Sequence, residues 1–176
     1  MEIAIEERAA RIKALILDVD GVLTDGRIAM NDRGEETKSF DAKDGQGLKM
    51  LISSGVEVIL ITGRRSGAVV HRSKDLGIEA VHQGVMDKRT LLRGLIIDKG
   101  LNRQEVCCMG DDIPDLAMFD EVGLRLAVAD AVGEVREKAD LIITKRGGRG
   151  AVREACEWLL KCRGEWDAAL TTFTGE

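Results

Sequence analysis

Short apolar runs alternate along the chain with segments whose apolar residues recur at helical spacing. A continuous apolar run between two such segments is typical of a parallel strand that is buried on both faces. The alternation therefore predicts an α/β fold built on a doubly wound, Rossmann-like parallel sheet. The predicted strands are 14–17, 56–61, 80–81, 106–109, 124–128 and 141–144. Gly77 and Gly100 follow helical segments 69–76 and 90–99, where glycine commonly ends a helix.

The segment from Gly26 to Phe40 breaks this alternation. Short extended flanks surround the turn-forming sequence Asn31-Asp32-Arg33-Gly34. We predict a β-hairpin over about residues 26–40 that projects from the sheet. Two short strands cannot bury their own apolar side chains, so we expect the hairpin to contact another subunit.

Length and composition limit the possible classes of protein. A chain of 176 residues fits one domain, here residues 1–176, with a tail over about 164–176 that docks on a partner subunit or frays. The chain is 44% hydrophobic and 32% charged, as expected for an ordered globular protein. A net charge of −5, 3% aromatic residues and no tyrosine argue against a nucleic-acid partner.

Compartment and membrane association follow from the termini, the apolar runs and the cysteines. The N-terminal segment is acidic and amphipathic, unlike a secretory signal, and no apolar run is long enough to span a membrane. The four cysteines form no C-x-x-C pair, and we expect them to stay reduced. The sequence therefore predicts a cytoplasmic protein without membrane contact.

Two carboxylates stand one residue apart where the first predicted strand ends. Asp18 and Asp20 belong to the sequence D-x-D-G-V-L-T, and alternate residues of an extended segment share a face. Ligands of open α/β sheets bind beyond the carboxyl ends of such strands, so the pair indicates phosphoryl chemistry. A surface turn is the structural alternative, since Asp and Gly are common there.

Two further polar motifs follow later strands. Thr62-Gly63-Arg64 ends the second predicted strand and offers a hydroxyl and a guanidinium to a phosphoryl group, unless Thr62 simply caps the next helix. Asp87 and Lys88 precede an apolar helix. Asp87 suits a helix cap, and Lys88 is either a solvated lysine or the fixed cation of a site.

An acidic cluster follows the strand 106–109. Gly110-Asp111-Asp112-Ile113-Pro114-Asp115 places three acids within five residues. Like charges repel, and carboxylate oxygens beside a phosphate suit Mg²⁺. The alternative is a helix start decorated with acids, because Pro114 and Asp115 fit a first turn.

Together these four motifs occur in order, each at or just after a predicted strand end. The set resembles the haloacid dehalogenase-like phosphatase superfamily. The resemblance implies that Asp18 is the nucleophile, that Asp20 is the general acid and base, and that Asp111 binds Mg²⁺. Thr62 and Lys88 would then hold the phosphoryl group.

The same resemblance implies finer roles. Mg²⁺ would be held by Asp18, Asp111 and the backbone carbonyl of Asp20, while Asp112 or Asp115 would orient metal-bound waters or Lys88. Only 41 residues separate Asp20 from Thr62, and 25 separate Thr62 from Lys88. Neither gap is long enough for a separate cap domain, so we expect a capless enzyme.

Substrate recognition is predicted from a second group of residues. Asp41-Ala42-Lys43-Asp44-Gly45-Gln46-Gly47 reads as a Gly-rich turn that could bind an anion through backbone N–H groups, or as a plain connection to a helix. Lys49, Arg64, Arg72 and Lys88 supply more positive charge than one phosphate needs. A second anionic group, such as a sugar-acid carboxylate, would account for the excess.

Within the superfamily, the chain most resembles capless, tetrameric 3-deoxy-D-manno-octulosonate 8-phosphate phosphatases. The matching parts are the hairpin, the segment 41–47, Thr62-Gly63-Arg64 with Arg72, Gln83-Gly84, Lys88 and the segment 147–154. The resemblance implies a homotetramer whose neighbouring subunit helps to cover each site, and a role in lipopolysaccharide precursor synthesis. It also implies substrate contacts at Asp41, Ala42, Lys43, Asp44, Gly45, Lys49, Arg64, Arg72 and Lys88.

Several alternatives stay open. Related nonulosonate 9-phosphate phosphatases tend to carry an acid after Thr-Gly, where this chain has Arg64. A non-catalytic tetrameric scaffold would be expected to have lost a catalytic acid or metal ligand, and none is missing here. A phosphoacceptor switch would keep a long-lived phospho-Asp18, and Asp20 argues against it because it would speed hydrolysis. Gly147-Gly148-Arg149-Gly150 lacks the full pattern of a dinucleotide-binding loop and is predicted to be a helix-entry turn.

Overall fold

The computed structural model describes residues 3–175 and centres on a six-stranded parallel sheet in the order β5-β4-β1-β6-β7-β8. All six predicted strands are confirmed, with ends that differ by up to two residues. The strands are β1 Ala14–Leu17, β4 Glu57–Thr62, β5 Ala80–Gln83, β6 Val106–Gly110, β7 Leu124–Ala127 and β8 Leu141–Ile142. The last strand stops early because the backbone N–H of Thr144 turns to the Glu154 carboxylate, 3.0 Å away.

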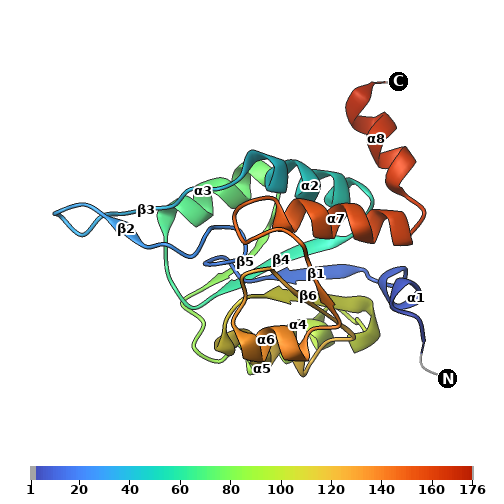
Figure 1. Ribbon diagram of the computed structural model, residues 1–176, viewed down its shortest axis with the longest axis horizontal. Coiled ribbons are helices and arrows are strands. Elements are labelled where there is room, and N and C mark those ends of the chain that lie inside the picture. The colour runs from blue at the N-terminus through green and yellow to red at the C-terminus, as the bar shows by residue number, and fades with distance from the viewer. Residues whose placement is uncertain (1–2, 176) are drawn as a thin grey trace.

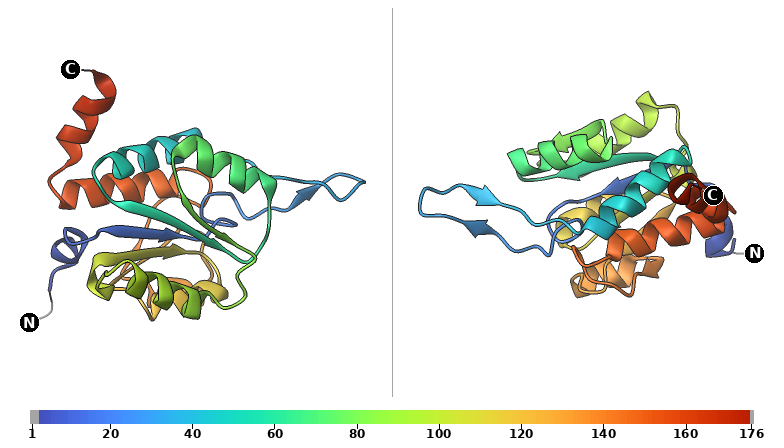
Figure 2. Two further views of the ribbon diagram at one scale, coloured as in Figure 1. Left: turned by 180° about the vertical axis from the view of Figure 1, so that it is seen from behind. Right: turned by 90° about the horizontal axis from the view of Figure 1, so that it is seen from above.

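Helices cover both faces of the sheet (Figure 1), as in a doubly wound fold. One layer holds α2 (Ala42–Ser53), α3 (Gly67–Leu76) and α7 (Ala151–Cys162). The other holds α4 (Lys88–Asp98), α5 (Leu116–Phe119) and α6 (Gly133–Lys138), with short 3₁₀ turns at Arg103–Glu105 and Ile113–Asp115. Figure 2 shows the same two layers from behind and from above.

The core lies between these layers because the strands are apolar on both faces. Every residue of β1 and β6 is buried, and Leu15, Ile16 and Leu17 pair in register with β4 and β6. Burial of one such side chain contributes roughly 1.5–3 kcal/mol. The cysteines are free, as predicted, and burial raises the pKa of the Cys107 and Cys108 thiols.

The predicted hairpin is confirmed and projects from the carboxyl-terminal end of the sheet (Figure 1). Its strands, β2 (Ala29–Met30) and β3 (Glu36–Thr37), pair antiparallel. The Asn31 side chain closes the turn by accepting from the backbone N–H groups of Arg33 and Glu35, each at 3.0 Å. Met30 is 58% exposed, so the hairpin leaves apolar surface in solvent as expected.

The first and last helices lie at the other end of the sheet (Figures 1 and 2). There α1 (Ile5–Ala9) precedes β1, and α8 (Trp166–Thr174) follows α7. The tail is therefore helical, with Trp166 packed against the core and Lys161 Nζ 5.1 Å from its ring centroid. Within residues 3–175 no helix combines the length and apolar character needed to cross a bilayer.

Of the two structures predicted for 41–47, the Gly-rich turn is wrong and the plain entry into a helix is the one found. Asp41 caps α2 by accepting from the Lys43 backbone N–H at 2.6 Å, so Gly45 and Gly47 lie inside the helix. A Cβ at Gly45 would stand 2.2 Å from the Arg72 side chain, and one at Gly47 would stand 3.1 Å from the Arg153 Cα. These glycines allow close packing of α2 against neighbouring helices.

Candidate active site

A cleft of about 500 Å³ lies at the carboxyl ends of the strands, where the sequence motifs converge. Each of its polar side chains lies at the carboxyl end of a strand or within a few residues after it, so the parallel sheet brings them to one edge. The cleft is lined by eight of the predicted residues: Asp18, Asp20, Thr62, Arg64, Lys88, Asp111, Asp112 and Asp115.

Lys88 lies at the centre of the site and joins two acids from different strands. Its Nζ donates to Asp18 Oδ1 at 2.6 Å and to Asp115 Oδ1 at 2.7 Å. The side chain is 7% exposed, so Lys88 is not a solvated lysine. Burial alone would lower its pKa, but the charges of Asp115 and Asp18 outweigh burial and raise the pKa above the usual value. Lys88 is therefore a fixed cation.

Asp87 is the N-cap of α4, as the sequence suggested. Its Oδ1 accepts from the Thr90 backbone N–H at 3.0 Å, which caps α4 and lowers the Asp87 pKa. Thr62, by contrast, is not a helix cap, because Ser66 occupies the N-cap position of α3. The buried Thr62 hydroxyl accepts weakly from the Arg64 N–H at 3.4 Å and remains beside the cleft.

Asp115, rather than Asp112, contacts Lys88. Asp115 Oδ2 also accepts from the backbone N–H groups of Asp111 and Asp112 at 2.9 and 3.3 Å, which holds the acidic loop in shape. Asp112 is exposed and accepts from the Ile113 N–H at 2.8 Å, as the N-cap of the 3₁₀ turn Ile113–Asp115. The predicted alternative of a helix start that carries acidic residues is therefore also correct, and one of those residues, Asp115, belongs to the acidic cluster with Asp18 and Asp111.

The acidic cluster has more negative charge than its contacts neutralise. One carboxylate oxygen each from Asp18, Asp111 and Asp115 lies within 4.8 Å of the others. Burial, followed by the charge of Asp115, raises the Asp18 pKa to about 6 and the Asp111 pKa to about 8. The buried Asp111 Oδ1 has no hydrogen-bond partner among the described residues. This hard oxygen donor set fits Mg²⁺, whose charge would reverse these shifts.

Comparison with known proteins assigns the family. A model described as haloacid dehalogenase-like hydrolase matches residues 70–154. The 3-deoxy-D-manno-octulosonate 8-phosphate phosphatase of Yersinia pestis is 41% identical over 163 residues, covering 93% of this chain and 87% of that protein. The chain belongs to the haloacid dehalogenase-like hydrolases. It is an enzyme of the phosphoric monoester hydrolase class.

Further relatives of this hydrolase agree with that assignment. The 3-deoxy-D-manno-octulosonate 8-phosphate phosphatase of Escherichia coli K12 is 42% identical over 92% of this chain and 86% of its own length. The phosphatase of the same name from Moraxella catarrhalis, solved with a magnesium ion, a phosphate ion and a KDO molecule, has a TM-score of 0.93. It is 44% identical, over 96% of this chain and 97% of that one.

Glycines unforeseen as site residues shape the cleft of this hydrolase. Gly21 has a φ of +99°, and a Cβ there would stand 1.9 Å from Asp111 Oδ2. A Cβ at Gly147 would stand 1.7 Å from the Gly21 carbonyl oxygen, and Gly148 donates to the Val22 carbonyl at 2.9 Å. The Gly-rich segment before α7 is therefore a helix-entry turn that supports the loop after Asp18 by close backbone approach.

Two residues of the hairpin also reach the site without having been predicted. Lys38 Nζ bonds the Asp20 carboxylate, and Glu36 pairs with Lys38 at 3.0 Å and with the Arg64 guanidinium. The hydrogen bond from Arg64 lowers the Glu36 pKa. The i, i+2 spacing of Glu36 and Lys38 places them on one face of a strand, but no sequence signal says that this face meets Asp20.

The predicted substrate residues do not gather in one place. Only Arg64 and Lys88 of that group line the cleft, whereas Asp41 lines a separate cavity of about 420 Å³ beside Phe40. Arg72 donates to the Asp41 carbonyl at 3.3 Å and lies 6.0 Å from the Phe40 ring centroid.

The other members of the group lie along α2. Ala42, Lys43 and Lys49 are exposed, and Gly45 is buried inside the helix. Asp44 is 1% exposed and accepts from the Arg153 backbone N–H at 2.8 Å, so it caps α7. Burial raises the Asp44 pKa to about 6. Its contacts are those of a structural residue, and the predicted substrate contact stays a prediction.

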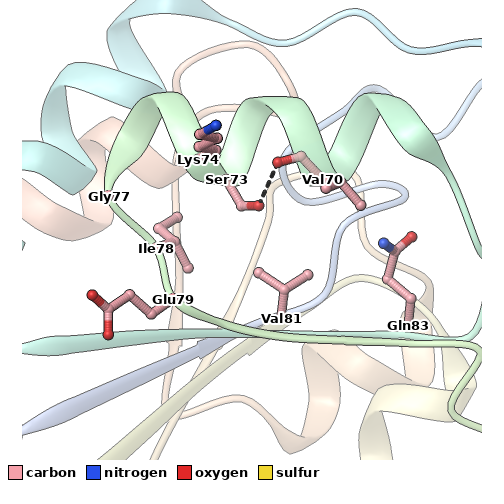
Figure 3. A pocket seen from close by; sticks show the side chains of 8 residues that line it. All are labelled: Val70, Ser73, Lys74, Gly77, Ile78, Glu79, Val81 and Gln83. Atoms are coloured by element: carbon pink, nitrogen blue, oxygen red, sulfur yellow. Dashed lines mark hydrogen bonds between the residues drawn. The ribbon is translucent and has the colours of Figure 1, made fainter.

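A further cavity, of about 540 Å³, lies between α3 and the edge strand β5 (Figure 3). Val70, Ile78 and Val81 supply its apolar walls, and Ser73 donates to the Val70 carbonyl at 3.0 Å. It shares none of the acids of the cleft. Its lining offers no constellation for phosphoryl chemistry, so the acidic cleft is the candidate active site.

Proposed function

We propose that this hydrolase converts 3-deoxy-D-manno-octulosonate 8-phosphate to 3-deoxy-D-manno-octulosonate and phosphate. The observation that carries this proposal is the buried Lys88 between Asp18 and Asp115, within a cleft that also presents Asp20 and Thr62. Such a site suits the transfer of a phosphoryl group to a carboxylate. The names of the relatives, each 41–44% identical, support the choice of substrate.

The chemistry divides between the two acids of the first motif. Asp18 attacks phosphorus while the bond to the sugar oxygen breaks, and Asp20 donates a proton to that oxygen. Asp20 then removes a proton from water, whose oxygen attacks phosphorus and breaks the bond to Asp18. Phosphate leaves, and both acids return to their starting state. The covalent intermediate splits one slow hydrolysis into two easier steps.

Positive charge and hydrogen bonds stabilise the transferring group. Asp18, Asp111 and the Asp20 carbonyl would hold Mg²⁺, which supplies charge neutralisation at the phosphoryl oxygens when bound. Lys88 is already charged and in contact with the nucleophile. The Thr62 hydroxyl lines the same cleft and offers a hydrogen bond to a phosphoryl oxygen.

Recognition of the sugar acid is assigned to the remaining basic residues. Arg64 lines the cleft, whereas Arg72 lies beside Asp41 and Phe40 around a different cavity. Residues outside the cleft can reach a substrate there if a second copy of the chain presents them. We therefore propose a homotetramer joined through the hairpins, a state that light scattering measures directly. We place the reaction in the cytoplasm, in the synthesis of lipopolysaccharide precursors.

The decisive experiment measures phosphate release from a panel of sugar phosphates, with Mg²⁺ and with EDTA. We expect the highest kcat/KM for the octulosonate 8-phosphate and no turnover in EDTA. Preference for a nonulosonate 9-phosphate would move the chain to that related group, which Arg64 argues against. Preference for neutral hexose phosphates would overturn the sugar-acid assignment, and no release from any monoester would favour a scaffold.

A further inference from the structure

Lys38 is a buried lysine that neither the motifs nor the proposed chemistry uses. It follows β3, in the second half of the hairpin, and its side chain is 3% exposed. An ammonium group is costly to bury unless anions surround it. Two carboxylates do so here: Asp20 accepts a hydrogen bond from Nζ, and Glu36 lies 3.0 Å from it.

The contact divides the two oxygens of Asp20 into different roles. Lys38 binds Oδ1, whereas the buried Oδ2 has no hydrogen-bond partner within residues 3–175. Asp20 lines the cleft, so Oδ2 is the oxygen left for the leaving group and for water. A carboxylate held at one oxygen rotates less about its side-chain torsions. Such preorganisation accelerates a proton transfer that depends on a short, aligned contact.

Glu36 fixes Lys38 in turn. Its two oxygens face different cations, with Oε1 toward Lys38 and Oε2 toward the Arg64 guanidinium. The four side chains form a row of alternating charge from Asp20 to Arg64. This row joins the hairpin to the turn that follows β4, and it places the ammonium against Asp20 from outside the sheet.

We propose that Lys38 is a positioning residue that holds the Asp20 carboxylate for proton transfer to the leaving oxygen. The proposal rests on the phosphatase chemistry above and adds a residue to it. It does not depend on which sugar acid is the substrate. Any alkyl phosphate with a poor leaving group needs the same proton, whereas p-nitrophenolate leaves without one.

Two substrates separate this role from a structural one. For Lys38→Met we expect kcat/KM to fall about 10- to 100-fold with an alkyl phosphate. General acid–base catalysis typically accelerates a reaction by about 10²–10⁴-fold, and misplacing Asp20 should lose part of that acceleration. With p-nitrophenyl phosphate we expect less than about a threefold change. The fall should appear in kcat more than in KM, and Lys38→Arg should restore most of it.

The matched control removes another paired lysine from the far end of the sheet. Lys13 pairs with Glu105 at 2.7 Å just before β1, and Lys13→Met should leave both rates unchanged. In an Asp20→Asn background, Lys38→Met should cause no further loss, because a residue that acts through Asp20 has nothing left to position. Thermal unfolding of each variant records any change in stability.

Equal losses with both substrates, or an additive loss in the Asp20→Asn background, would overturn the proposal. If Lys38→Met lowers the unfolding temperature too far for assay, Glu36→Gln tests the same row of charges. It should lower kcat/KM by a smaller factor, and again more for an alkyl phosphate than for p-nitrophenyl phosphate. The wild type could reject octulosonate 8-phosphate while Lys38→Met still lowers kcat/KM for another alkyl phosphate more than for p-nitrophenyl phosphate. That outcome would refute the proposed substrate and leave the role of Lys38 standing.

Discussion

At the amino-terminal end of the sheet the partly buried Asp140 is balanced by cations, whereas at the carboxyl-terminal end acids are left in excess. At the first end, Asp140 pairs with Arg8 at 2.9 Å and with Arg125 at 2.7 Å. Burial would raise the Asp140 pKa, but the hydrogen bonds from both arginines lower it to about 2. At the other end, burial and neighbouring acids raise the Asp111 pKa to about 8.

The opposite pKa shifts of Asp140 and Asp111 distinguish a structural ion pair from a site that can bind a ligand. The two arginines stabilise the charged form of Asp140 in the folded protein, so this charge contributes to stability. The acids clustered around Lys88 repel one another, so they lower stability until a cation binds. Backbone packing compensates at that end, since Gly21 and Gly147 bring two loops into contact. The following predictions test this contrast, beginning with the largest effect.

Asp18→Asn should lower kcat by at least about 10⁴-fold, because an amide cannot serve as the nucleophile. The unfolding temperature should stay the same or rise, since a repelling charge leaves the cluster. Steady-state kinetics and thermal unfolding measure the two effects. Asp140→Asn is the control and should keep kcat near wild type. Turnover near wild type in Asp18→Asn would refute the mechanism.

Gly147→Ala should lower the free energy of unfolding by about 3 kcal/mol, because its Cβ would stand 1.7 Å from the Gly21 carbonyl oxygen. Urea denaturation measures the change. Gly94→Ala in α4 is the matched control, since a Cβ there meets nothing within 4 Å. It should raise stability by about 0.5–1 kcal/mol. Similar effects of the two substitutions would mean that close loop packing does not support the cleft.

Mg²⁺ at about 100 times its Kd should stabilise the wild type by about 2.7 kcal/mol, because it binds the folded cluster and not the unfolded chain. Asp111→Asn should abolish this shift while raising stability in EDTA, since it removes a repelling charge. Thermal unfolding with Mg²⁺ and with EDTA measures both. Asp140→Asn should retain the Mg²⁺ shift. A wild type without any shift would count against a metal site among these acids.

Asp140→Asn should lower stability at pH 7 by less than about 2.4 kcal/mol, because folding lowers the Asp140 pKa from 3.8 to about 2 and solvent screens part of the effect. A lowered pKa stabilises the fold above the unfolded value of 3.8, and this stabilisation is lost as pH falls through about 2. The difference between wild type and variant should therefore shrink below pH 4. Urea denaturation across this range measures it, and a difference independent of pH contradicts the assignment.

The positions of the acids that line the cleft could be predicted because they depend on local pattern. Continuous apolar runs identify buried strands, and parallel strands end at one edge of a sheet. Asp18 and Asp111 therefore had to lie near each other once their strands were recognised. The helical start at Ala42 was missed because Gly45 and Gly47 are typical of turns. Tertiary packing against Arg72 and α7 overrides that local preference.

The amino-acid sequence alone determined the α/β class, the strand order along the chain, the hairpin and the chemistry of the cleft, since each follows from residue types at short spacing. Only the tertiary structure decided that Asp115 contacts Lys88, that Lys38 binds Asp20 and that Arg72 lies away from the cleft. Those pairs are 18 to 31 residues apart. Contacts at such separation depend on how whole elements pack, which sequence periodicity does not specify.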